Sequence, residues 1–159
     1  MNLAILCVGK LREPYWRDAA AEYQKRLSRL GGLSIHECPD LPVPKNAPAA
    51  ELSRVLEAEG ASLLSLVRPR DYVIALCVEG KQMDSPALAR HLQLLEDGGM
   101  GRGVFLIGGS NGLSPGVLSR ADERLSFSPM TFPHQLARVM LAEQLYRCRK
   151  ILAGETYHK

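Results

Sequence analysis

Residues 103–115, GVFLIGGSNGLSP, decide the fold. The run from Gly103 to Ile107 is almost wholly apolar and predicts a buried strand. Three glycines follow within the next five residues. Ser114-Pro115 is then typical of a helix start, because serine caps free backbone amides and proline fits the first helical position. A strand, a glycine loop and a helix in succession are the repeating unit of an α/β fold.

The same alternation runs along the rest of the chain. Apolar runs predict further strands at residues 2–8, 33–38, 71–78 and 125–128. Helices are expected at residues 14–30, 48–67, 85–96, 115–121 and 133–151, the third of them capped by Ser85. Apolar strands separated by helices predict one α/β domain over residues 1–159, with a mostly parallel sheet covered on both faces.

Ligands bind parallel sheets at the carboxyl ends of the strands, and three segments are placed there by the predicted strands. They are residues 76–80, 108–112 and 127–133. The second segment lacks the spacing of a dinucleotide fingerprint and the lysine of a phosphate-binding loop, so it predicts either a tight turn or a close approach to another kind of ligand. The third is unusually apolar for a loop, which favours packing against the core or against a flat ligand such as an adenine ring.

Composition narrows the class of protein. The chain has 159 residues, of which 46% are hydrophobic and 23% charged, as expected for a folded globular domain. It contains no apolar run of roughly 18 residues and no basic residue ahead of the first strand, so neither a membrane span nor a signal peptide is expected. The four cysteines are widely spaced, which favours reduced thiols in a cytoplasmic protein without a metal site.

Basic charge gathers at both ends of the chain. The first thirty residues carry six lysines and arginines against three acidic residues, and residues 133–159 carry five against two. This distribution is compatible with a polyanionic partner. Arg138 and Arg149 lie about 20° apart around the last predicted helix, where they either follow a nucleic-acid backbone or form a solvated face.

The last helix has an apolar arc that spans about half its circumference, wider than a surface helix needs. We therefore expect it to be buried against a second subunit as well as against the core. Gln144 and Arg147 interrupt this arc, and Glu143 and Arg147 have the spacing of an ion pair. His134 begins the helix, where the helix dipole favours the neutral imidazole.

Several of these features together resemble a known family. Leu-Ile-Gly-Gly-x-x-Gly-Leu-Ser-Pro at residues 106–115 is followed by Pro133-His134, by Leu145-Tyr146-Arg147 and by Tyr157-His158 near the end. The combination is similar to the RlmH-type 23S rRNA (pseudouridine-N3-)-methyltransferases of the SPOUT superfamily, over the whole chain. The resemblance implies a trefoil knot in the C-terminal part, a homodimer, and S-adenosylmethionine bound in the knot.

The resemblance also implies roles for particular residues. The cofactor is expected to touch Leu76, Gly108, Phe127, Ser128, Pro129, Met130, Thr131 and Phe132. In the tail, His158 and Lys159 are expected to stabilise the deprotonated base, while Arg138, Arg147 and Tyr157 hold RNA. The family usually ends in Tyr-His-Arg, whereas this chain ends in lysine, which keeps the charge but loses the planar fork of arginine.

The expected reaction is methylation of N3 of a pseudouridine in 23S rRNA on the assembled ribosome. One alternative is a SPOUT enzyme that acts on tRNA or on a ribose hydroxyl. Another is a ribosome-binding protein without catalytic activity. A purely structural dimerisation module is a third, but it leaves the glycine and proline loops unexplained.

Overall fold

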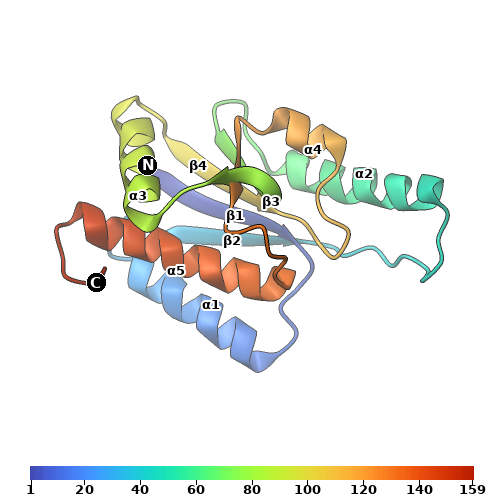
Figure 1. Ribbon diagram of the computed structural model, residues 1–159, viewed down its shortest axis with the longest axis horizontal. Helices are drawn as coiled ribbons and strands as arrows, with labels where there is room; N and C mark the ends of the chain where they lie inside the picture. The colour runs from blue at the N-terminus through green and yellow to red at the C-terminus, as the bar shows by residue number, and fades with distance from the viewer.

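Five parallel strands form one sheet in the computed structural model, which describes residues 1–159 (Figure 1). The strand order across the sheet is β2-β1-β4-β3-β5. The strands are β1 (Asn2–Val8), β2 (Leu33–Cys38), β3 (Tyr72–Gln82), β4 (Arg102–Ile107) and β5 (Glu123–Ser126). The parallel α/β sheet predicted from the apolar runs is thus confirmed.

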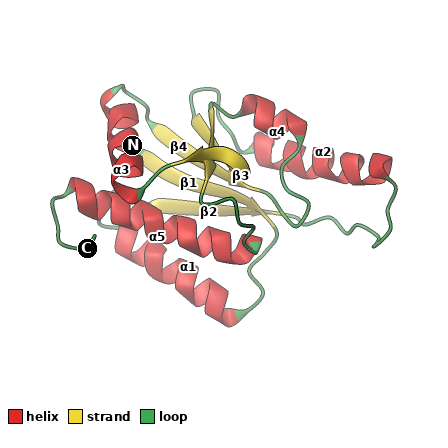
Figure 2. Cartoon of the chain, viewed as in Figure 1, coloured by secondary structure: helices red, strands yellow, loops and turns green.

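Helices cover both faces of this sheet, as predicted (Figure 2). They are α1 (Pro14–Leu27), α2 (Ala49–Ser65), α3 (Ser85–Asp97), α4 (Pro115–Arg120) and α5 (His134–Leu152). Alternate strand residues point to opposite faces, so Ile5 and Phe105 pack with α1, α3 and α5, whereas Leu6 and Leu106 pack with α2 and α4. No helix is long and apolar enough to cross a membrane.

The observed helix bounds differ from the prediction by up to three residues, and two differences at helix ends have a clear cause. The first helix ends at Leu27 rather than at residue 30, because the Gly32 amide donates a hydrogen bond to the Leu27 carbonyl at 2.9 Å and closes the helix end. The third helix is capped by Asp84, whose side chain accepts a hydrogen bond from the Ala87 amide at 2.7 Å. Ser85 was expected to be the cap. It is instead the first helical residue, and its hydroxyl is free to bond elsewhere.

The largest difference is in β3, which continues four residues beyond the predicted end. Leu125 of β5 pairs with both Leu76 and Lys81, so the intervening residues bulge out of the ladder. Gly80 permits this bulge, because a Cβ at that position would lie 2.4 Å from the backbone of Leu125. The bulge carries residues 77–79 to the carboxyl edge of the sheet.

Strand order and pairing do not define how a chain threads through itself. The trefoil knot therefore stays a prediction of the resemblance.

Candidate active site

A pocket of about 830 Å³ lies at the carboxyl ends of β3, β4 and β5. All three segments selected from the sequence contribute to its wall. Of the residues assigned to the cofactor by resemblance, its lining includes Leu76, Gly108, Phe127, Ser128, Met130, Thr131 and Phe132, but not Pro129. Glu79, which belongs to the predicted segment 76–80, also lines this pocket, and so does Arg124, which sequence reasoning did not single out. We call it the glycine-loop pocket.

The glycine loop after β4 folds back tightly on itself. The Gly112 amide donates to the Gly109 carbonyl at 3.1 Å, and Gly112 has a φ of 83°. A Cβ at Gly108 would lie 2.3 Å from the Gly112 carbonyl oxygen. Glycine is therefore needed for the turn itself, and the turn leaves bare backbone along one wall of the pocket.

The helix start that follows the loop is already capped. The Ser114 hydroxyl accepts a hydrogen bond from the Val117 amide at 3.2 Å, as predicted for an N-cap serine. Its side chain is buried against α2, where a Cβ on Gly60 would lie 2.3 Å from the serine oxygen. This short helix thus anchors the loop to the back of the sheet.

The apolar loop of residues 127–133 is only partly covered by the rest of the chain. Phe127 and Phe132 are half-buried, but Met130 is 72% exposed. Serine side chains hold the loop in shape: Ser126 donates to the Ser128 carbonyl at 3.0 Å, and the Ser128 hydroxyl accepts from the Met130 amide at 3.0 Å. The loop therefore offers its apolar side chains to the pocket and to solvent.

His134 and Arg138 lie in the first turns of α5 and have different environments. His134 lines the glycine-loop pocket, and burial together with the nearby Arg138 charge lowers its pKa, so the neutral imidazole is favoured as predicted. Arg138 is 1% exposed. Its guanidinium donates to Glu37 at 2.7 Å and to the Gly9 carbonyl at 2.8 Å.

These contacts correct the assignment of Arg138 to RNA binding. A buried guanidinium can reach a phosphate only by leaving both partners, and breaking a buried ion pair costs about 3–5 kcal/mol. Arg149 is also engaged, since it donates to Glu96 and to the Met1 carbonyl, each at 2.8 Å. The two arginines therefore do not form the RNA-following face that their helical spacing suggested.

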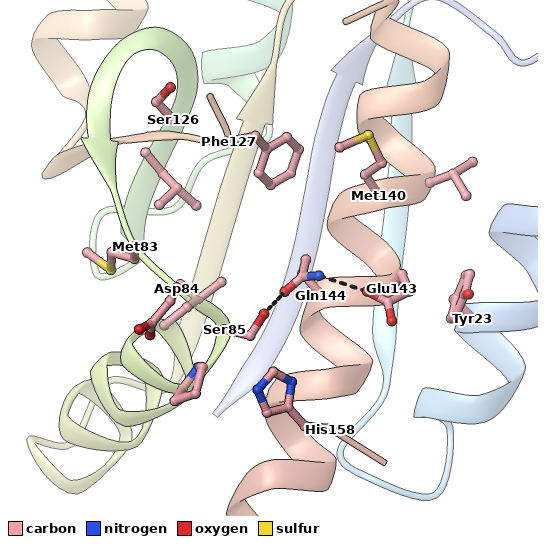
Figure 3. Close-up of a pocket in the computed structure, with 14 residues that line it drawn as sticks. Tyr23, Met83, Asp84, Ser85, Ser126, Phe127, Met140, Glu143, Gln144 and His158 are labelled. Carbon is pink, nitrogen blue, oxygen red and sulfur yellow. Dashed lines mark hydrogen bonds between the residues drawn. The ribbon is translucent and has the colours of Figure 1, made fainter. Parts of the chain in front are cut away.

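A second pocket of about 700 Å³ lies between the start of α3, helix α5 and Tyr23 of α1 (Figure 3). It shares Ser126 and Phe127 with the glycine-loop pocket, so the two cavities adjoin. His158 of the C-terminal tail reaches into its lining. We call it the tail pocket. One feature of the sequence pointed to it, namely the interruption of the apolar arc at Gln144.

Glu143 joins the tail to α5. Its carboxylate accepts from Arg147 at 2.5 Å, which confirms the predicted ion pair, and from the Tyr157 hydroxyl at 3.1 Å. The Arg147 guanidinium lies 4.8 Å from the centre of the Tyr157 ring. Burial and the Glu143 charge raise the pKa of Tyr157, so its hydroxyl stays protonated and donating. Lys159 lies beyond this cluster and is exposed.

The glycine-loop pocket has the properties of a cofactor site. Its volume falls within the range of about 300–1,000 Å³ that small-molecule sites occupy, and it combines apolar walls with a few polar groups. The bare backbone near Gly108 gives a ligand close access to main-chain amides and carbonyls. No group of three or more His, Cys, Asp and Glu side chains is placed to hold a metal ion.

Comparison with known proteins agrees with this architecture. A solved structure of a probable methylase family protein from Haemophilus influenzae Rd KW20 matches 99% of this chain and 70% of its own, with a TM-score of 0.55 and 12% identity. A probable methyltransferase from Bordetella pertussis Tohama I matches 93% of this chain and 94% of its own, with a TM-score of 0.57 and 13% identity. These likenesses concern the fold. A family model described as "Predicted SPOUT methyltransferase" matches residues 1–158, and the chain belongs to this family of RlmH type.

Proposed function

We propose that the protein methylates N3 of a pseudouridine in 23S rRNA, with S-adenosylmethionine as the methyl donor and the assembled ribosome as the substrate. The observation that carries the proposal is the adjacency of the two pockets. One lies at the carboxyl edge of the sheet and is lined by the glycine loop; the other receives the C-terminal tail. Together they offer neighbouring places for a donor and an acceptor, and proximity supplies much of the rate of a methyl transfer.

The glycine-loop pocket is the proposed cofactor site. When bound, S-adenosylmethionine supplies an electrophilic methyl group, which moves to N3 while the sulfonium becomes the neutral thioether of S-adenosylhomocysteine. Leu76 and Phe132 would pack on the adenine ring, and the backbone around Gly108 would bond its polar edge. Phe127 lines both pockets and would contact both the cofactor and the base.

The acceptor nitrogen must lose its proton before or during the transfer. The charge of Lys159 would favour the anionic base, and His158 lies in the lining of the tail pocket, where its imidazole would accept the proton. His134 is a second candidate base, because its lowered pKa keeps the imidazole neutral. Its position in the cofactor pocket rather than the tail pocket makes it the less favoured of the two.

Arg147 of α5 and Tyr157 of the tail remain the proposed RNA contacts, because the Arg147 side chain is 25% exposed even while it pairs with Glu143. Arg138, which is 1% exposed, is no longer among them. A homodimer is part of the proposal, because the apolar arc of α5 stays only half-buried at Leu136, Met140 and Ile151. A second subunit would cover that arc and bring a second tail near each site. A cytoplasmic location is part of the proposal, because assembled ribosomes are the proposed substrate.

Methyl-labelled S-adenosylmethionine tests the proposal directly. The protein would be incubated with assembled ribosomes, free 23S rRNA and bulk tRNA, each from cells that lack the modification. Label confined to ribosomes, and located on a pseudouridine, is the expected result. Label on tRNA or on a ribose would show that the substrate is the one named in the first alternative. Cofactor binding without any transfer would favour the non-catalytic ribosome-binding alternative.

A further inference from the structure

The side-chain amide of Gln144 stands in the tail pocket with half of its hydrogen-bonding capacity in use (Figure 3). Its carbonyl oxygen accepts from the Ser85 hydroxyl at 2.6 Å, and its nitrogen donates to Glu143 at 2.9 Å. A primary amide offers two N–H groups and two lone pairs. One donor and one acceptor therefore remain on the same planar group.

The neighbours fix which way this amide faces. The Glu143 carboxylate accepts a hydrogen bond from this amide, so the nitrogen of Gln144 must lie on its side. Glu143 is held in turn by Arg147 and Tyr157. Ser85 is free to bond the carbonyl because Asp84, one residue earlier, caps the helix. The amide is thus oriented before any ligand arrives, which reduces the entropy lost on binding.

The rest of the pocket suits a flat ring. Phe127, Met83 and Met140 give apolar surface around the amide, and Tyr23 lies across from them. Because Phe127 and Ser126 also line the glycine-loop pocket, a ring in the tail pocket would lie next to the proposed methyl donor. A donor and an acceptor on one planar group match an edge in which a ring N–H adjoins a carbonyl, as in a pyrimidine base.

We propose that Gln144, held by Ser85 and Glu143, binds the N1–H and C2 carbonyl edge of the target pseudouridine in the tail pocket. This proposal rests on the proposed function and adds the residue that selects the base. Pseudouridine is joined to its sugar through carbon, so N1 keeps its hydrogen, and N3 on the other side of C2 stays free to receive a methyl group. In uridine N1 carries the sugar. Gln144 can then bind only an edge that contains N3. Such binding would cover the nitrogen that must receive the methyl group.

Two isomeric nucleotides test whether the N1–H edge of the base is recognised. In 3-methylpseudouridine 5′-monophosphate the N1–H edge is present and N3 is blocked; in 3-methyluridine 5′-monophosphate no ring N–H remains. We expect the first to bind roughly tenfold more tightly than the second, because 3-methyluridine lacks the ring N–H and would leave the Gln144 carbonyl without that partner. Gln144→Leu should abolish the difference, and Ser85→Ala should reduce it two- to threefold by freeing the amide.

The methionines provide the measurement, because Met83 and Met140 line the tail pocket and Met130 lines the glycine-loop pocket. Their carbon-13 methyl signals, assigned by single Met→Leu substitutions, report the two pockets separately in one spectrum. S-adenosylhomocysteine should shift Met130, and 3-methylpseudouridine 5′-monophosphate added next should shift Met83 and Met140. Gln93→Leu removes an amide that lines neither pocket and should leave the tenfold difference unchanged.

The outcomes distinguish this inference from the proposed function. If S-adenosylhomocysteine leaves Met130 unmoved, the proposed cofactor site is wrong. If Met130 moves but the two nucleotides bind equally, or neither shifts Met83 and Met140 at millimolar concentration, the role of Gln144 is wrong while the cofactor site stands. A difference between the isomers that persists in Gln144→Leu would likewise overturn the inference, since another group would then read the edge.

Discussion

Replacing Gly108 by alanine should damage the glycine-loop pocket through a single methyl group. The added Cβ would lie 2.3 Å from the oxygen, 2.5 Å from the carbon and 3.1 Å from the Cα of Gly112. All three are backbone atoms, so no side chain can rotate away, and the hydrogen bond between Gly112 and Gly109 must open. Forcing a group into a packed site in this way costs about 1–3 kcal/mol.

That cost translates into two measurable changes. In a domain of this size each kcal/mol lowers the melting temperature by roughly 2–4 °C, so differential scanning calorimetry should detect the substitution clearly. Isothermal titration with S-adenosylmethionine should show affinity weakened by roughly tenfold or more, because the displaced loop forms a wall of the proposed cofactor site.

Gly101→Ala is the matched control. Gly101 has no atom within 4 Å of a built Cβ and no positive φ, so alanine there should change neither the melting temperature nor the cofactor affinity appreciably. Wild-type stability and wild-type affinity in Gly108→Ala would refute the steric argument. A loss of stability with unchanged affinity would support the steric argument for the turn. It would also show that the loop is not part of the cofactor site.

Three further predictions test other parts of the structure. Deleting residues 157–159 should abolish methyl transfer in the labelling assay while titration shows unchanged cofactor affinity; normal turnover would eliminate the tail mechanism. Glu37→Gln should lower the free energy of unfolding, measured in urea, by about 3 kcal/mol because it leaves the Arg138 guanidinium buried without its counter-charge. Arg138→Met should cost less, since the Glu37 side chain is 35% exposed and can turn to water; the reverse order would contradict this reasoning. The pKa of His134 is lowered in the folded protein, so the unfolded chain binds the proton more readily below about pH 6.5 and stability should fall with decreasing pH. Between about pH 7.5 and about pH 5.5 the wild type should lose more stability than His134→Gln; parallel pH curves would show that His134 does not titrate as inferred.

The sheet could be predicted well because each of its buried strands is marked by a local feature of the sequence. Each buried strand is a continuous apolar run, and the parallel sheet places every such run with its carboxyl end at one edge. The bulged part of β3 and the segments after β4 and β5 therefore meet in one pocket, as expected. The end of β3 was missed because residues 79–82 are glycine or polar, and their pairing depends on Leu125, more than forty residues away.

Charged residues were harder to place, because helical spacing does not tell which side of a helix is covered. The position of Arg138 around α5 was compatible with exposure to solvent. In the structure its side chain is instead bound by Glu37 and Gly9, which lie near the N-terminus of the chain. A lone arginine among apolar residues signals either a surface or a buried ion pair. Only the assembled sheet decides between them.

The tail pocket was indicated in the sequence only by a polar residue in an otherwise apolar helix face. Tyr23, Ser85 and Gln144 come from three distant helices, so no local motif could have joined them. The sequence nevertheless contained one anomaly, a glutamine within the apolar arc of α5. Placing a polar amide among apolar neighbours costs free energy unless each of its groups finds a partner. Ser85 and Glu143 each bond one of its polar atoms, and the second donor and the second acceptor are the groups that the proposed base would bind.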